Sequence, residues 1–271
     1  MCERLPQKDK VHAWTTILKN WGVKLLSDLK GKVAIVTGSS KGIGAGIAER
    51  LAADGVCVIV NYSRSAEDAA TVVERITAAG GKAFAVKANL SEPAEIQPLI
   101  DAALRHFGKL DILVNNAGVY KVDTLDTLSA ESFDEHYNLN VRGLLLATQA
   151  AARVLPSGGV VVNISSGLAK SPHPNLHVYC STKGAVDTLT RSLAMELGPR
   201  KIRVVGIAPG FTATEGNAES AKQAAERIVA KTPLGRVGLP KDIAATVSYA
   251  VSLDAGWITG TTIDVAGGMV F

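Results

Sequence analysis

The sequence has 271 residues, of which 47% are apolar and 20% charged, with 26 glycines against 10 prolines, and this composition excludes a disordered or collagen-like chain. Net charge is +4, of which residues 1–30 carry +3, so the rest of the chain lacks the excess of Lys and Arg that a nucleic-acid-binding domain shows. No apolar run reaches the roughly 18 to 20 residues that span a bilayer, and the three cysteines have neither disulfide nor metal spacing, which favours a cytoplasmic protein without a membrane span.

The first 30 residues are predicted to form an appendage. Apolar residues recur there at helical spacing and predict an amphipathic helix, namely Trp14, Ile17, Leu18, Trp21 and Leu25. A surface or subunit-contact helix and added expression sequence both fit this segment, and a membrane-surface or targeting role stays open. The main domain is expected to span residues 31–271.

From Lys32 onward, short β-branched runs alternate with longer helical patterns, which indicates βαβ units. Seven strands are predicted, at 33–37, 56–61, 82–87, 110–115, 159–164, 202–208 and 261–265. The predicted helices are 43–54, 66–79, 94–107, 131–154, 177–198, 218–231 and 240–253. Because the strands are continuous Val/Ile runs, the sequence predicts a single α/β domain with a doubly wound, parallel, Rossmann-type sheet.

A glycine-rich segment, TGSSKGIG at 37–44, follows the first predicted strand and leads into a helical pattern. Glycines allow a tight turn and let backbone N–H groups approach a pyrophosphate, and the positive end of the following helix faces the same anion. A turn that only reverses the chain is the alternative, but the order of strand, glycines and helix favours phosphate binding. The GxxxGxG spacing differs from the GxGxxG of many dehydrogenases, and the GK[ST] ending of a P-loop is absent.

The end of the second predicted strand indicates which dinucleotide binds. A carboxylate there would accept hydrogen bonds from the ribose 2′-hydroxyl of NAD, but the residues are Asn61, Tyr62, Ser63 and Arg64. A 2′-phosphate would meet Arg64, Ser63 and Lys41 of the turn, and such contacts are worth roughly a 10- to 100-fold preference. We therefore predict NADPH or NADP+ as the cofactor, with solvated Lys41 and Arg64 side chains as the alternative.

Tyr179 and Lys183 lie four residues apart on a predicted helix and therefore share one face. This spacing occurs by chance on many surface helices, so it indicates a catalytic pair only if other residues support it. Ser165 and Ser166 end the fifth predicted strand, and NNAG at 115–118 ends the fourth. Because the carboxyl ends of parallel strands border the ligand crevice, these features converge at one edge of the sheet.

Five motifs are specific when taken together: TGSSKGIG at 37–44, NNAG at 115–118, NISS at 163–166, YCSTK at 179–183 and PGFTAT at 209–214. Through them, the sequence over about 30–271 resembles the short-chain dehydrogenase/reductase family, of the NADP-dependent carbonyl reductase and 3-oxoacyl-reductase type. The resemblance implies that Tyr179 donates the proton, Lys183 holds the ribose and Ser166 orients the carbonyl. It also implies a homotetramer, and that Asn140 holds a water in the proton relay; an ordinary helix-surface asparagine is the alternative.

The cofactor-binding residues are assigned by the turn and by the same resemblance. They are Gly38, Ser40, Lys41, Gly42, Ile43, Gly44, Asn61, Tyr62, Ser63, Arg64, Asn89, Leu90, Asn116, Ala117, Gly118, Tyr179, Lys183, Pro209, Gly210 and Thr212. Asn89 stands where the family usually has an acid, and VAGG at 265–268 replaces its usual DGG ending. The histidines show no metal-ligand spacing and are interpreted as surface residues, with His173 and His177 placed to touch substrate; no metal is expected.

Reduction of a ketone needs a hydride on carbon and a proton on oxygen. A free tyrosine has a pKa near 10, so we expect Lys183 and the oxidised cofactor to lower the pKa of Tyr179. The predicted function is an NADPH-dependent oxidoreductase that reversibly reduces a small-molecule ketone or aldehyde, with residues 211–231 covering the substrate. A 3-oxoacyl thioester reductase of fatty-acid synthesis and a non-catalytic NADP-binding sensor are the alternatives.

Overall fold

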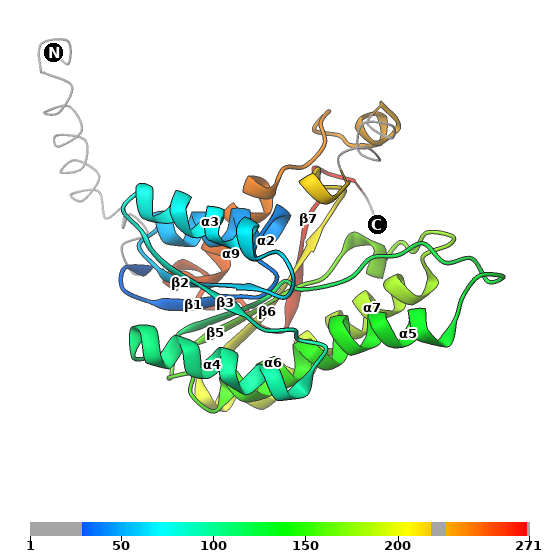
Figure 1. The fold of residues 1–271 in the computed structure, drawn as a ribbon. Coiled ribbons are helices and arrows are strands. Elements are labelled where there is room, and N and C mark those ends of the chain that lie inside the picture. Colours follow the sequence, from blue (N-terminus) through cyan, green and yellow to red (C-terminus); the bar gives the residue numbers. More distant parts are fainter. Residues whose placement is uncertain (1–28, 218–225, 270–271) are drawn as a thin grey trace, which may run out of the picture.

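Seven parallel strands form one sheet in the computed structural model, which describes residues 29–217 and 226–269 (Figure 1). The strands are β1 (Val33–Val36), β2 (Cys57–Tyr62), β3 (Lys82–Lys87), β4 (Ile112–Asn115), β5 (Val160–Ile164), β6 (Arg203–Pro209) and β7 (Thr261–Val265). Their order across the sheet is β3-β2-β1-β4-β5-β6-β7, so the chain reverses its direction of progress between β1 and β4. The predicted doubly wound parallel sheet is confirmed, with strand boundaries within two residues of the prediction.

Helices cover both faces of this sheet (Figure 1). The helices α2 (Gly42–Ala53), α3 (Ala66–Ala78) and α9 (Pro240–Val251) pack on one face. The opposite face is covered by α4 (Pro93–Phe107), α6 (Leu144–Ala152) and α7 (His177–Leu197), and α5 (Ala130–Tyr137) precedes α6. The predicted appendage lies outside the described residues except for its last two, and the predicted helix 218–231 is described only from residue 226.

Both faces of β1 are buried, as the continuous apolar run predicts. Ala34 and Val36 join the cluster formed with α2, α3 and α9, whereas Val33 and Ile35 join the cluster on the other face. Burial of one such branched side chain contributes roughly 1.5–3 kcal/mol, so this central strand anchors both layers. Among the described residues, no helix combines the length and apolar character that a bilayer crossing requires.

The predicted helix 131–154 corresponds to helical backbone from 130 to 152, but its middle turn is π-helical, which the sequence pattern did not predict. A π-helical segment, η2 (Asn138–Gly143), separates α5 from α6. A Cβ on Gly143 would lie 2.5 Å from the carbonyl oxygen of Leu90, so glycine is needed where η2 passes the end of β3. Single π turns inside helices occur frequently at functional sites, and this one carries Asn140.

A buried polar network joins the centre of the sheet to two helices. The Asn115 side-chain amide on β4 donates to Thr148 Oγ1 on α6 and to Asn163 Oδ1 on β5, both at 2.9 Å. Asn163 in turn donates to Thr190 Oγ1 on α7 at 3.0 Å. Because each amide group finds a partner, burial of these residues carries no desolvation penalty for an unpaired group.

Candidate active site

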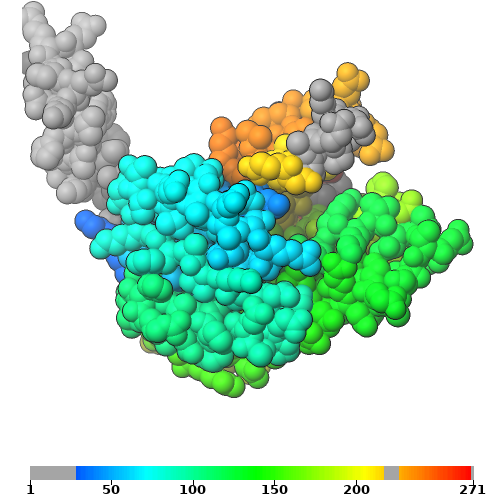
Figure 2. Space-filling view, viewed as in Figure 1, coloured from blue at the N-terminus to red at the C-terminus, as the bar shows by residue number. Residues whose placement is uncertain are grey.

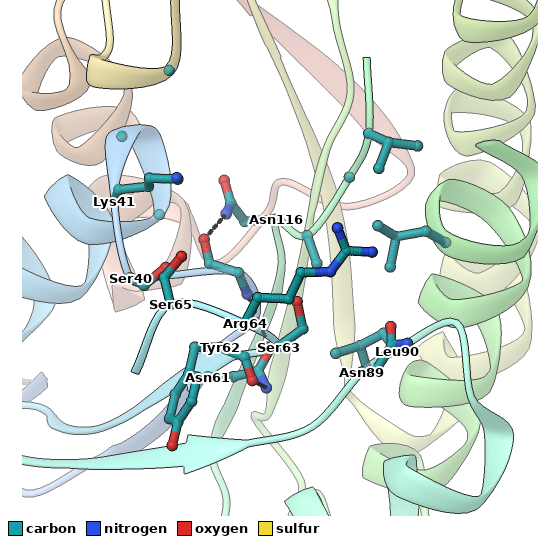
Figure 3. A pocket seen from close by; sticks show the side chains of 18 of the residues that line it. Ser40, Lys41, Asn61, Tyr62, Ser63, Arg64, Ser65, Asn89, Leu90 and Asn116 are labelled. Carbon is teal, nitrogen blue, oxygen red and sulfur yellow. Dashed lines mark hydrogen bonds between the residues drawn. The ribbon is translucent and has the colours of Figure 1, made fainter. Parts of the chain in front are cut away.

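A cavity of about 490 Å³ opens at the carboxyl ends of the neighbouring strands β1 and β4, where the order of the strands reverses. We call it the switch-point cavity. Its walls are the turn between β1 and α2 and the segments that follow β2, β3 and β4 (Figure 3). Figure 2 shows the surface hollowed between the blue and cyan segments and the green segments. In doubly wound folds this position is where ligands bind.

Most of the predicted cofactor-binding residues line this cavity. They are Gly38, Ser40, Lys41, Gly42, Ile43, Gly44, Asn61, Tyr62, Ser63, Arg64, Asn89, Leu90, Asn116, Ala117 and Gly118. Thr214 and Gly216 also line it, although the prediction chose Thr212. The PGFTAT motif contains two threonines, and the sequence carries no signal that separates them.

Two glycines shape the turn between β1 and α2. Gly38 has φ = +60°, and a Cβ there would lie 2.9 Å from Ala117 Cα, so both conformation and close approach require glycine. The Gly42 N–H, at the start of α2, donates to a carboxylate oxygen of Glu215 at 3.0 Å. A negatively charged oxygen is therefore already bound where a helix N-terminus and glycine turn favour anions.

Two asparagines hold this turn in shape. Asn61 Oδ1 accepts from the Gly38 N–H at 3.0 Å, and its amide donates to the Ala88 carbonyl at 3.0 Å. The Asn116 amide donates to the Thr37 and Gly38 carbonyls at 2.9 and 3.0 Å. Both side chains therefore position the turn and have their main hydrogen bonds within the protein, which the sequence did not indicate.

The outer part of the switch-point cavity is cationic. Figure 3 shows Arg64 extended into the cavity and Lys41 on the turn. Within the described part of the chain, no ion pair engages either side chain. The acidic lining residue Glu135 is paired with Lys121. Lys41 and Arg64 are thus available to a negatively charged ligand.

Tyr179, Lys183 and Ser166 come together beyond the inner end of this cavity. Tyr179 and Lys183 lie in the first turns of α7, and Ser166 follows β5. Lys183 Nζ donates to the Ile164 carbonyl at 2.8 Å and lies 5.6 Å from the centroid of the Tyr179 ring. The Ser166 side chain interacts with the Tyr179 hydroxyl, whereas the Ser165 hydroxyl donates to the Lys183 carbonyl at 3.4 Å. Ser166, the serine chosen from the sequence, is thus the one beside the Tyr179 hydroxyl, and its role in orienting the carbonyl stays a prediction.

The pKa values of this pair differ from the expectation. Burial raises the pKa of Tyr179 to about 12, and the interaction with Ser166 offsets only part of that rise. Burial also lowers the pKa of Lys183 to about 8, with Asp187 acting in the opposite direction. Among the protein's own groups, desolvation therefore dominates both shifts, and the Lys183 ammonium donates its hydrogen bond to the Ile164 carbonyl.

Asn140 is buried in η2, with 2% of its surface exposed, so it is not a helix-surface residue. Its Oδ1 accepts from the Val119 N–H at 2.8 Å, and its amide donates to the Val119 carbonyl and to Thr182 Oγ1 at 3.0 and 3.1 Å. These bonds join the loop after β4 to α7. Asn140 therefore acts on the site by holding two of its walls together.

A second cavity, of about 340 Å³, adjoins Ser166, and we call it the apolar cavity. It is lined by Tyr120, Ser166, Leu168, His173, Leu176, Pro209, Gly210, Phe211, Arg227, Ile228, Lys231 and Met269. Tyr120 contacts Tyr179 edge to face, with ring centroids 5.0 Å apart, and no sequence motif pointed to this residue. Pro209 and Gly210 lie here and not in the switch-point cavity, and Thr212 lines neither.

The histidines occupy different kinds of position in the structure. His173 lines the apolar cavity, but His177 does not. His136 is fully buried and bonds to the backbone at Lys121 and Ser132, so its interpretation as a surface residue was wrong. Among the described residues, no three His, Cys, Asp or Glu side chains are grouped as a metal site would require.

Comparison with known proteins gives matches over most of the chain. The family model described as enoyl-(acyl carrier protein) reductase matches residues 38–270. An uncharacterized oxidoreductase of Methylorubrum extorquens is 48% identical over 247 residues, which cover 90% of this chain and 100% of the relative. A short-chain dehydrogenase/reductase structure from Serratia marcescens is 39% identical, with a TM-score of 0.86 and coverage of 90% of this chain and 100% of that one.

A short-chain dehydrogenase from Burkholderia cenocepacia, solved in complex with NADP, is 40% identical, with a TM-score of 0.84 and coverage of 89% of this chain and 99% of that one. These matches include the glycine turn, the switch-point cavity and the helix that carries Tyr179 and Lys183. Sequence identity and fold therefore agree along nearly the full length of the described domain. This chain belongs to the short-chain dehydrogenase/reductase family of oxidoreductases.

Proposed function

We propose that this protein is an NADPH-dependent oxidoreductase that reversibly reduces a ketone or aldehyde to an alcohol. The observation that carries the proposal is the position of Tyr179, Ser166 and Lys183 between the two cavities. Lys183 Nζ lies 3.8 Å from a Cβ built on Gly118, which lines the switch-point cavity, while Ser166 lines the apolar cavity. A hydride donor on one side and a carbonyl on the other would meet at the Tyr179 hydroxyl.

The residues of the switch-point cavity fit a nicotinamide dinucleotide. The Gly42 N–H already binds an anionic oxygen, that of Glu215, and a side chain at Gly38 would collide with Ala117. Lys41, Ser63 and Arg64 would hold a 2′-phosphate, and the absence of an acid among residues 61–64 removes the usual partner of the NAD ribose. The Burkholderia cenocepacia relative was solved with NADP, which supports this choice. When bound, the nicotinamide would supply the hydride.

The chain's own residues handle the proton. A Tyr179 pKa of about 12 keeps the hydroxyl protonated near neutral pH, as reduction of a carbonyl requires. The Ser166 hydroxyl, beside that phenol, would donate to the same carbonyl oxygen and orient it. Lys183 places a positive charge near the ring, and this charge stabilises the phenolate that proton transfer leaves behind.

The test is NADPH oxidation over a panel of ketones and aldehydes, with the Tyr179→Phe variant as the control. A positioned general acid contributes roughly 10²- to 10⁴-fold, so we expect kcat of the variant to fall by that range while NADPH still binds. Undiminished turnover by Tyr179→Phe would refute the assigned proton donor. The panel includes an enoyl thioester, because the matching family model carries an enoyl reductase description. Turnover of that compound alone would replace carbonyl reduction with alkene reduction.

A further inference from the structure

The apolar cavity opens directly on the proposed reaction centre. Ser166 forms part of its wall, and Tyr120, which contacts the Tyr179 ring, forms another part. Leu168, Phe211 and Ile228 line it with carbon. A carbonyl compound that reaches the Tyr179 hydroxyl would therefore place the rest of its structure in this cavity.

Two cations line the same cavity from one helical turn. Residues 226–231 have helical backbone, so Arg227 and Lys231, four positions apart, lie on the same face of it. Ile228 is buried and fixes this turn against the domain. The two charged side chains are exposed and line the cavity on the side of that turn.

These two charges have no ion-pair partner among the residues that the structure describes. The described residues that line the apolar cavity include no Asp or Glu. Throughout residues 29–217 and 226–269, each ion pair involves other side chains, including the nearby Lys170, which pairs with Asp264 at 2.6 Å. His173, which also lines the cavity, adds no negative charge. Two unpaired cations beside an apolar wall favour a ligand that brings its own negative charge.

We infer that the substrate is a carbonyl compound with an anionic group, a carboxylate or a group of similar charge, which Arg227 and Lys231 bind while the carbonyl lies at Tyr179. This inference rests on the carbonyl reduction proposed above and specifies its substrate class. One charge-assisted contact to a partly exposed cation is worth roughly 3- to 10-fold in affinity, so two together predict roughly 10- to 100-fold. The effect belongs to KM, because the charges lie away from the reacting atoms.

The experiment compares 4-acetylbenzoate with its uncharged methyl ester, using NADPH and the full-length chain. Three proteins are assayed: the wild type, Arg227→Gln/Lys231→Gln, and Lys82→Gln/Arg105→Gln. The last variant also loses two positive charges, but from exposed positions on β3 and α4 that lie away from both cavities. Equilibrium dialysis of 4-acetylbenzoate against each protein gives a readout that does not depend on turnover.

We expect the wild type and the Lys82→Gln/Arg105→Gln control to prefer the acid by roughly 10- to 100-fold in kcat/KM. Arg227→Gln/Lys231→Gln should lose that preference through a higher KM for the acid, whereas the Lys82→Gln/Arg105→Gln control should keep wild-type turnover of both compounds. Equal use of acid and ester by the wild type, or an acid preference that survives in Arg227→Gln/Lys231→Gln, would overturn the inference and leave carbonyl reduction intact. If neither compound is reduced but dialysis shows acid binding that only Arg227→Gln/Lys231→Gln loses, carbonyl reduction fails and the anion site stands. If the acid does not bind at all, the anion site fails.

Discussion

Lys183 is a buried side chain, and burial destabilises its charged form. Burial lowers the pKa of this side chain from 10.5 to about 8. Below about pH 8 both the folded and the unfolded chain hold the proton, and the folded state carries the full penalty. Between pH 8 and 10.5 the folded chain has released a proton that the unfolded chain keeps, so the free energy of unfolding rises with pH over this interval.

The prediction is that Lys183→Met flattens this rise. Urea unfolding at pH 8 and at pH 10 measures it, and the gain in the free energy of unfolding between the two should be smaller in the variant by about 2 kcal/mol. The measurement stops at pH 10 because Tyr179, whose pKa rises from 10.0 to about 12 on folding, lowers the free energy of unfolding as the pH rises beyond that value. Lys87→Met, at an exposed position on β3, is the control and should keep the wild-type rise. Identical rises in wild type and Lys183→Met would contradict the prediction.

The choice between the two cofactors is also decided by single residues. Lys41 and Arg64 line the switch-point cavity and have no ion-pair partner among the described residues. Lys41→Ala/Arg64→Ala should therefore weaken NADPH binding roughly 10- to 100-fold and leave NADH binding nearly unchanged, since only NADPH carries the 2′-phosphate. Titration of nicotinamide fluorescence measures both dissociation constants. An equal loss of affinity for NADPH and NADH would show that the two cations do not bind the 2′-phosphate.

At the scale of elements, η2 joins the two halves of the site. Its Gly143 lies against the Leu90 carbonyl, where a Cβ would approach to 2.5 Å, and its Asn140 joins the loop after β4 to α7. Gly143→Ala should therefore reduce the free energy of unfolding by roughly 1–3 kcal/mol, because the backbone has to move. Gly184→Ala in α7 is the matched control, since a Cβ there meets nothing within 4 Å and should stabilise the helix by roughly 0.5–1 kcal/mol. Denaturant unfolding of both variants should give changes of opposite sign, and a stabilised Gly143→Ala would contradict the steric argument.

Elements set by local pattern were predictable, and those set by contacts between distant segments were not. The strands were found because buried parallel strands require continuous Val and Ile runs. The π-helical turn within helix 131–154 packs at Gly143 against the Leu90 carbonyl, about 50 residues away, and no local pattern records that contact. In the site, motif spacing identified Tyr179 and Lys183, whereas Tyr120 and Thr214 enter only because the loops after β4 and β6 fold over the cavities.

At the scale of the whole molecule, the homotetramer implied by family resemblance stays a prediction. The family resemblance implies contacts through helix faces near residues 94–154, and exposed apolar side chains in this range include Phe133 and Leu145, the latter 38% exposed. We expect mass photometry to give a species of four times the 28.3 kDa chain mass. Leu145→Lys should shift that species to smaller ones, because a charge at an apolar contact is costly to desolvate. Phe84→Lys, on the β3 edge, should leave the assembly intact, and a wild-type monomer would remove the tetramer from consideration.

The hydrogen-bonded chain from Thr148 through Asn115 and Asn163 to Thr190 has a consequence for how the central strands find their alignment. Asn115 and Asn163 are directly opposite each other in the pairing of β4 with β5. If β4 slipped by one residue, its apolar side chains would exchange faces, and both amides would be enclosed without partners. Each orphaned amide costs roughly 1–3 kcal/mol, which is comparable to losing a buried leucine. The two asparagines therefore add to the apolar pattern a polar penalty against any shift in the pairing of β4 with β5 at the middle of the sheet.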